Sequence, residues 1–170
     1  PTGWHGHLIA YPDLGGGGLG RWIALREKFA RALDPVISSI GLRNTTPHTR
    51  LAHTGPGLEG LGFLLLLRDG LPEKAAGNAT LKARFARILA DVGDCLPFDG
   101  EEWAARTIET YNGLKHANRA KPDDIDVMHA WAESVMVTRA WVALELGVSP
   151  DLVKSRLADD RQPRRFQRIV

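Results

Sequence analysis

The residues best suited to chemistry lie in one short stretch, residues 111–119, which reads Tyr-Asn-Gly-Leu-Lys-His-Ala-Asn-Arg. If the stretch is helical, at about 100° per residue, Asn112, His116 and Arg119 share one face. An amide, an imidazole and a guanidinium, with Lys115 beside them, can together hold a phosphate, offset its charge and move a proton. Spacing alone also fits a solvent-exposed polar face with no catalytic role, and that interpretation stays open.

Two further residues are expected to bear on this stretch. Gly113 in a helix interior costs about 1 kcal/mol, which predicts that a neighbouring helix or a ligand approaches the backbone there. Glu59 stands beside Leu58 and Leu61, and burying its carboxylate without a partner would be costly. We therefore expect Glu59 to meet a cation or the polar face of the helix that carries His116, close to His116 itself.

The elements that must position these residues are predicted to be helices. Apolar residues recur at steps of three and four over residues 21–40, with an interruption near Pro35, and over residues 58–67. Asn78 is predicted to cap a third helix with its apolar residues within 81–92, and a fourth begins near Asp99 or Glu101 and ends at about Asn118.

The last part of the chain predicts the longest helix. Asp123 and Asp124 open it, Gly147 ends it, and its apolar side chains are expected to lie on one stripe. A short helix follows over residues 150–157. No alternating β-branched run longer than about four residues stands between these segments, so the fold class is predicted to be all-α, an antiparallel bundle of four to six helices.

Composition narrows the class of protein. A chain of 170 residues predicts about one domain, and its longest strongly apolar run, Phe63 to Leu67, is far shorter than the roughly 20 residues that a membrane helix needs. The net charge of +2 is too small to indicate a nucleic-acid partner by itself. The single cysteine, Cys95, fits a reducing compartment, so we expect a cytoplasmic protein.

The ends of the chain differ from its middle. Residues 1–20 are rich in glycine and are interpreted as a linker or the edge of a preceding domain, and residues 21–160 as the helical domain. Residues 161–170 form a basic tail containing Phe166. His48 and His53, like His5 and His7, are predicted to be loop histidines, so neither a metal nor another cofactor is expected.

The spacing Asn112-x-x-x-His116 near the end of a helix resembles the Arg-Asn-x-x-x-His signature of HEPN domains. Together with Glu59 on a preceding apolar helix, residues 111–119 are similar to the C-terminal HEPN domain of ApeA-type anti-phage defence proteins. The resemblance covers about residues 21–160. It departs from the signature at Tyr111, which stands in the place of the arginine.

The resemblance implies a homodimer in which two copies of the motif helix face one cleft, and a metal-independent endoribonuclease with RNA as its substrate. It implies that His116 and Asn112 are catalytic, under the control of an N-terminal sensor domain. Because the arginine of the signature does not carry over, we expect Arg119, one turn beyond His116, or Lys115 to supply its positive charge. Arg119 is then the third catalytic residue, and Lys115, Tyr111 and Glu59 are expected to bind the substrate. Because Tyr111 replaces the arginine, a degenerate module that dimerises or binds nucleotide or RNA stays an alternative, as does a plain helical scaffold.

Overall fold

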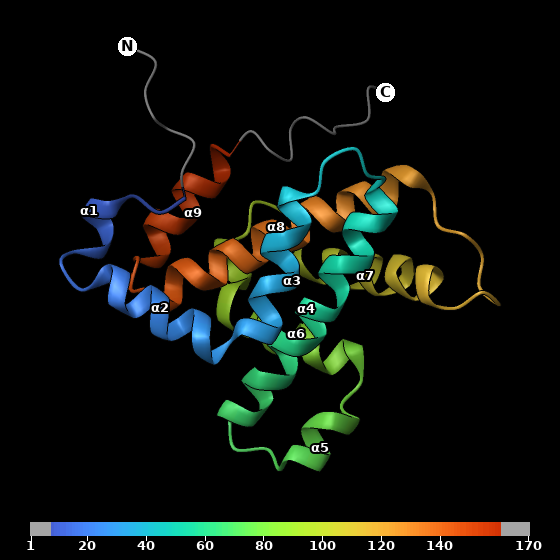
Figure 1. The fold of residues 1–170 in the computed structure, drawn as a ribbon, viewed down its shortest axis with the longest axis horizontal. Helices are drawn as coiled ribbons and strands as arrows, with labels where there is room; N and C mark the ends of the chain where they lie inside the picture. Colours follow the sequence, from blue (N-terminus) through green and yellow to red (C-terminus); the bar gives the residue numbers. More distant parts are fainter. Residues whose placement is uncertain (1–7, 161–170) are drawn as a thin grey trace.

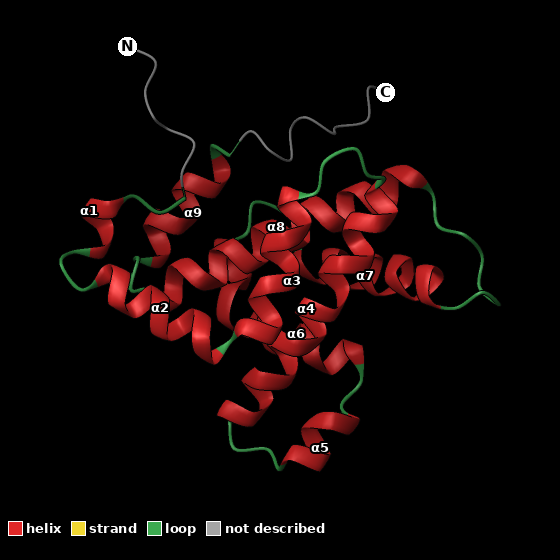
Figure 2. Cartoon of the chain, viewed as in Figure 1, coloured by secondary structure: helices red, strands yellow, loops and turns green. Residues whose placement is uncertain are grey.

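The computed structural model describes residues 8–160, and these residues are helical with no strand among them (Figure 2). The predicted all-α class is therefore confirmed. In chain order the elements are α1 Tyr11–Leu14, α2 Gly18–Lys28, α3 Ala30–Gly41, α4 Pro47–Arg68, α5 Glu73–Asn78, α6 Leu81–Val92, the short 3-10 helix η1 Gly93–Cys95, α7 Gly100–Lys115, α8 Asp124–Glu145 and α9 Pro150–Ala158. Within the described range, no helix is both long and apolar enough to cross a membrane.

Helix α8 is the centre of the bundle, and α3, α4, α6, α7 and α9 all pack against it (Figure 1). Three consecutive residues of α8, Val135, Met136 and Val137, are all buried, although their side chains point in different directions around the helix. The expectation of a single apolar stripe is therefore wrong, and the apolar side chain of Ile125 at the start of the helix is exposed. A helix covered by five others buries most of its circumference.

Aromatic rings fill the core on two sides of α8. Trp103 of α7 stacks on Phe85 of α6, with ring centroids 5.1 Å apart, and Trp141 of α8 meets Phe29 edge to face at 4.8 Å. All four rings are almost completely buried. Burial of such side chains contributes roughly 1.5–3 kcal/mol each, which anchors α6 and α7 against α8.

The starts of the later helices follow from their capping residues. The Asp99 carboxylate accepts a hydrogen bond from the backbone N–H of Glu102 at the start of α7, and the Asp123 carboxylate accepts one from Ile125 at the start of α8. These two predictions are confirmed. Gly147, with φ of 89°, follows α8 in a conformation that glycine adopts at low cost.

The cap of α6 was assigned to the wrong residue. Asn78 is the last residue of the separate helix α5, and the hydroxyl of Thr80 caps α6 by accepting a hydrogen bond from the N–H of Ala83. Both residue types are good caps, so local sequence did not separate them.

The break in the first predicted helix lies at Phe29, between α2 and α3, and not near Pro35. Pro35 sits inside α3, where the helix continues despite the missing N–H donor. Phe29 adopts φ of −113° and ψ of 21°, outside the helical values, and its ring is buried against Trp141. The chain therefore changes direction at Phe29, whose side chain packs into the core.

Helix α4 is twice as long as predicted and takes in His48 and His53, which were expected in a loop. Thr46 caps it through the N–H of Thr49, and Pro47 occupies the first turn, where a missing N–H costs little. Glycines and Pro56 obscured the helical pattern of its first half. Together with α8, α4 forms the frame against which α7 is placed.

Part of the glycine-rich segment joins the same bundle. Leu8 is buried in the core, Gly18 and Gly20 lie in α2, and Arg156 of α9 donates hydrogen bonds to the carbonyl of Leu8 and the carboxylate of Asp13. The division of the chain at residues 20 and 160 stays a prediction. His5 and His7, and the basic tail with Phe166, lie outside the described residues.

Candidate functional site

The motif stretch begins inside α7, whose core-facing side is fixed by packing. Trp103, Thr107 and Tyr111 are buried, and Asn112 is half-buried at the edge of the same helix. Residues 115–120 are all exposed. The helix therefore carries the motif from the core to the surface within two turns.

His116 is the residue at which α7 ends. Its φ of −119° and ψ of 108° are extended, and its N–H donates a hydrogen bond to the carbonyl of Asn112 at 3.1 Å. The N–H of Arg119 in turn donates to the carbonyl of His116 at 3.0 Å, which forms a turn. The expected continuous helical face is thus wrong beyond Lys115: His116 and Arg119 lie on the connection to α8, which spans residues 116–123.

Gly113 is approached closely, but by the connection that follows α7 and not by the neighbouring helix or ligand that was expected. A Cβ at this position would lie 3.1 Å from both the carbonyl oxygen of Ala120 and Cδ of Pro122. The second half of the α7–α8 connection therefore folds back onto the last turn of α7. The absence of a side chain at Gly113 allows that contact.

Tyr111 is buried at the contact between α4 and α7. Its side chain is 4% exposed and packs against Gly55 of α4, where an added Cβ would lie 2.2 Å from Cε2 of the ring. Burial raises the pKa of Tyr111 well above its ordinary value, and the charge and hydrogen bonding of Glu59 act in the same direction. Tyr111 thus packs between α4 and α7, and its contact with a substrate stays a prediction.

Glu59 meets the cation that its position required. Its carboxylate lies 3.0 Å from Nζ of Lys115 at the end of α7 and 3.6 Å from the guanidinium of Arg84 on α6. The Lys115 ammonium also lies 4.7 Å from the centre of the Tyr111 ring, within the range of a cation–π contact. Glu59 is therefore an ion-pair partner of Lys115, the residue that precedes His116 in the chain, and two cations already lie beside its oxygens.

The exposed groups at the end of α7 are an imidazole and a guanidinium. His116 and Arg119 are exposed, and no ion pair joins Arg119 to another residue of the range 8–160. Lys115 is 40% exposed but is held by Glu59. This arrangement can transfer a proton through His116 and attract a phosphate through Arg119, with Lys115 as a second cation.

No group of three or more histidine, cysteine or acidic side chains in the described part of the chain is placed to hold a metal ion. His48 faces Asp124 across α4 and α8, and His53 is exposed on α4. Cys95 is buried, and burial is the main cause that raises the pKa of its thiol, which disfavours the reactive thiolate.

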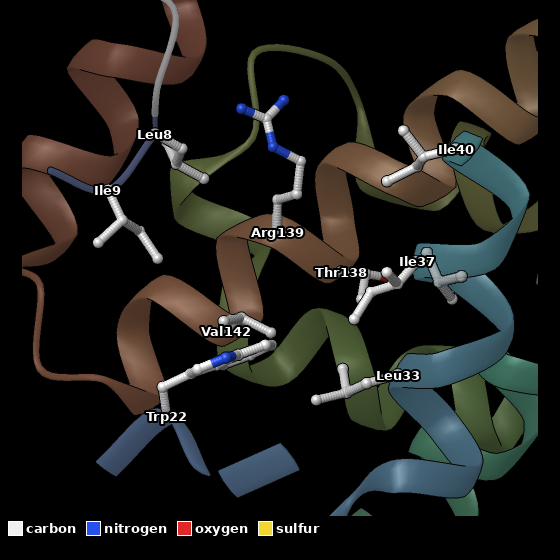
Figure 3. A pocket seen from close by; sticks show the side chains of 10 residues that line it. Leu8, Ile9, Trp22, Leu33, Ile37, Ile40, Thr138, Arg139 and Val142 are labelled. Carbon is white, nitrogen blue, oxygen red and sulfur yellow. The ribbon is translucent and has the colours of Figure 1, made fainter. Parts of the chain in front are cut away.

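An apolar pocket of about 230 Å³ lies elsewhere, between α2, α3 and α8 (Figure 3). Trp22, Leu33 and Val142 line it, and Arg139 stands at its edge with its guanidinium directed away from the apolar side chains. That guanidinium pairs with the carboxylate of Asp160 at 2.6 Å. None of residues 111–119 lines this pocket, so it does not form part of the candidate site.

Comparison with protein families matches residues 67–152, just over half of the chain, to the description Apea-like HEPN. The chain belongs to the Apea-like HEPN family. The matched segment runs from the end of α4 to the start of α9 and contains His116 and the whole motif stretch. It leaves out Glu59 and Gly55, which the HEPN domain packs against the motif helix. No curated protein and no solved structure matches the chain.

Three residues of this HEPN site escaped prediction because their contacts join distant segments. Gly55 accommodates Tyr111, Arg84 shares Glu59 with Lys115, and His48 meets Asp124 at the start of α8. Of these three residues, Gly55 is the one with a local signal, because a glycine inside a helix suggests that another group packs closely against the backbone there.

Proposed function

We propose that this HEPN domain is a metal-independent endoribonuclease whose acid–base residue is His116. The observation that carries the proposal is the placement of His116 in a member of the Apea-like HEPN family: it ends α7, is exposed, and stands three residues before the exposed Arg119. An imidazole titrates near neutral pH, so it can both accept and give a proton under physiological conditions.

The reaction uses the nucleophile that RNA carries. His116 takes the proton of a 2′-hydroxyl, the 2′-oxygen bonds to the adjacent phosphorus, and the bond from phosphorus to the 5′-oxygen breaks. A second imidazole protonates the leaving 5′-oxygen. In a twofold homodimer that imidazole is His116 of the other copy. The products are a 2′,3′-cyclic phosphate and a free 5′-hydroxyl.

The cations at the end of α7 stabilise the negative charge that develops on the phosphate in the transition state. Arg119 is the principal candidate because its guanidinium is exposed and is not paired within the range 8–160. Lys115 contributes from its place beside Glu59, and Asn112 positions either the phosphate or the imidazole. The domain would act in the cytoplasm as an anti-phage effector controlled by an N-terminal sensor.

The test is cleavage of total RNA by the purified protein in excess EDTA, compared with the His116→Ala variant. We expect the wild-type protein to cut RNA and the variant to lose about 100-fold or more of the rate, with an unchanged helical circular dichroism spectrum. Because a separate sensor could hold the domain inactive, any longer form of the protein is assayed alongside it. Equal cleavage by folded His116→Ala would contradict the proposal.

A second candidate is an RNA-binding or dimerisation module that does not cleave. Tyr111 favours it, because this residue replaces the arginine of the HEPN signature and its side chain is buried rather than turned to a substrate. RNA binding without cleavage in the same assay supports this module. If the protein neither binds nor cleaves RNA, the result supports a helical scaffold.

A further inference from the structure

The connection over residues 116–123 carries both exposed groups of the site, so its conformation decides where His116 and Arg119 point. Its near end is held at Gly113, where Ala120 and Pro122 pack on the last turn of α7. Its far end is the start of α8. What holds that end therefore bears on the geometry of the whole connection.

The far end makes a contact with α4. Asp123 is used as the cap of α8, but the next carboxylate, Asp124, lies 3.4 Å from Nε2 of His48 in the first turn of α4. This Nε2 is buried and makes no hydrogen bond in the described part of the chain, and the Asp124 carboxylate is a charged group within ion-pair distance of it. Lys121 approaches the same carboxylate oxygen at 4.0 Å.

The first turns of α4, which carry His48, are held in place by a cap and by core packing. The Thr46 cap holds the first turn of α4, and one turn further on Leu51 is completely buried against Val127 of α8, with Leu114 of α7 packed on the same cluster. The starts of α4 and α8 lie side by side at one end of the bundle, and the α7–α8 connection arcs away from them (Figure 1). A side chain on α4 can thus restrain the start of α8.

We propose that His48 is a positioning residue: its contact with Asp124 fixes the far end of the 116–123 connection and so the placement of His116 and Arg119. The role in catalysis rests on the proposed function, whereas the restraint on the connection does not. Without the imidazole, the one ion pair left to Asp124 among residues 8–160 is that with the exposed Lys121, and such a pair is worth little at the surface. Misplacement of catalytic groups by about 1 Å can cost up to about 100-fold in rate.

The experiment is hydrogen–deuterium exchange of the purified protein, followed by NMR at the two amides of residues 116–123 that donate hydrogen bonds, those of His116 and Arg119. We expect His48→Ala to speed exchange there about tenfold, with the buried amides of α6 and α9 unchanged. His48→Gln, whose amide can replace the Nε2–H donor, restores the wild-type rate, and Asp124→Asn tests the other partner. His53→Ala is the matched control, because His53 lies on the same helix but is exposed.

RNA cleavage by the same variants tests the catalytic part. His48→Ala is expected to lower kcat about tenfold with little change in KM, and His48→Gln to recover it. If the wild-type protein does not cleave RNA, the proposed function fails while the exchange experiment still decides the role of His48. Equal exchange of residues 116–123 in His48→Ala and His53→Ala overturns the inference.

Discussion

The nine-residue motif divides into two regions with different environments. Residues 111–115 end a helix whose packing is tight: Tyr111 is 4% exposed and Lys115 is held by Glu59. Residues 116–119 leave the helix and are exposed. The first region should therefore determine stability and the second activity, so substitutions in the two regions should have separable effects.

The largest effect on stability is expected from Gly55→Ala. The new Cβ would lie 2.2 Å from Cε2 of Tyr111, so the buried ring or a helix must shift, which costs about 1–3 kcal/mol in the free energy of unfolding. Gly60→Ala on the same helix is the control, because its nearest atoms lie 3.5 Å away or more, and alanine improves helix propensity. Urea denaturation compares the two. Equal stabilities would show that Tyr111 is not held as tightly as described.

The second prediction concerns the two cations, one on each side of the division. Arg119→Ala should lower the rate of RNA cleavage about tenfold while the midpoint of urea unfolding stays unchanged, because the side chain is exposed. Lys115→Ala should lower the rate less and the stability slightly, since it removes the nearer of the two cations, Lys115 and Arg84, that pair with Glu59. The reverse order of the two rates would assign the phosphate contact to Lys115.

The smallest effect is expected from Tyr111→Phe, about 1 kcal/mol at neutral pH from the lost hydroxyl interaction with Glu59. Its pH dependence is more telling. Because the pKa of Tyr111 is raised above its ordinary value of about 10, the folded state favours the protonated phenol. That contribution is complete below about pH 10 and is lost as pH rises above it.

Urea unfolding at pH 9 and pH 11 measures this. The wild-type protein should lose more stability between the two than Tyr111→Phe. The same loss in both proteins would mean that the Tyr111 hydroxyl is accessible to water.

Much of the frame was predictable from residues close together in the chain. Asp99 and Asp123 were assigned to the helix starts that they cap, and Gly113 to a close approach. The cap of α6 was wrong because Asn78 and Thr80 are both suitable caps two residues apart. The motif was recognisable because its spacing is local, and the family match over residues 67–152 confirms that recognition.

The end of α7 was not predictable in the same way. Nothing between Lys115 and Pro122 forbids a helix, so propensity extended it to about Asn118, whereas the chain leaves the helix at His116 and packs Ala120 and Pro122 against Gly113. The break at Phe29 has the same origin, since the burial of its ring against Trp141 sets the chain direction.

The sequence by itself thus determined the helical class, the starts of α7 and α8, and the family, because caps, helical periodicity and a short motif depend on neighbours within about one turn. Only the tertiary structure decided that Tyr111 is buried, that Glu59 holds Lys115, and that His48 meets Asp124. Such contacts join residues tens of positions apart, and no local preference specifies which helices pack together.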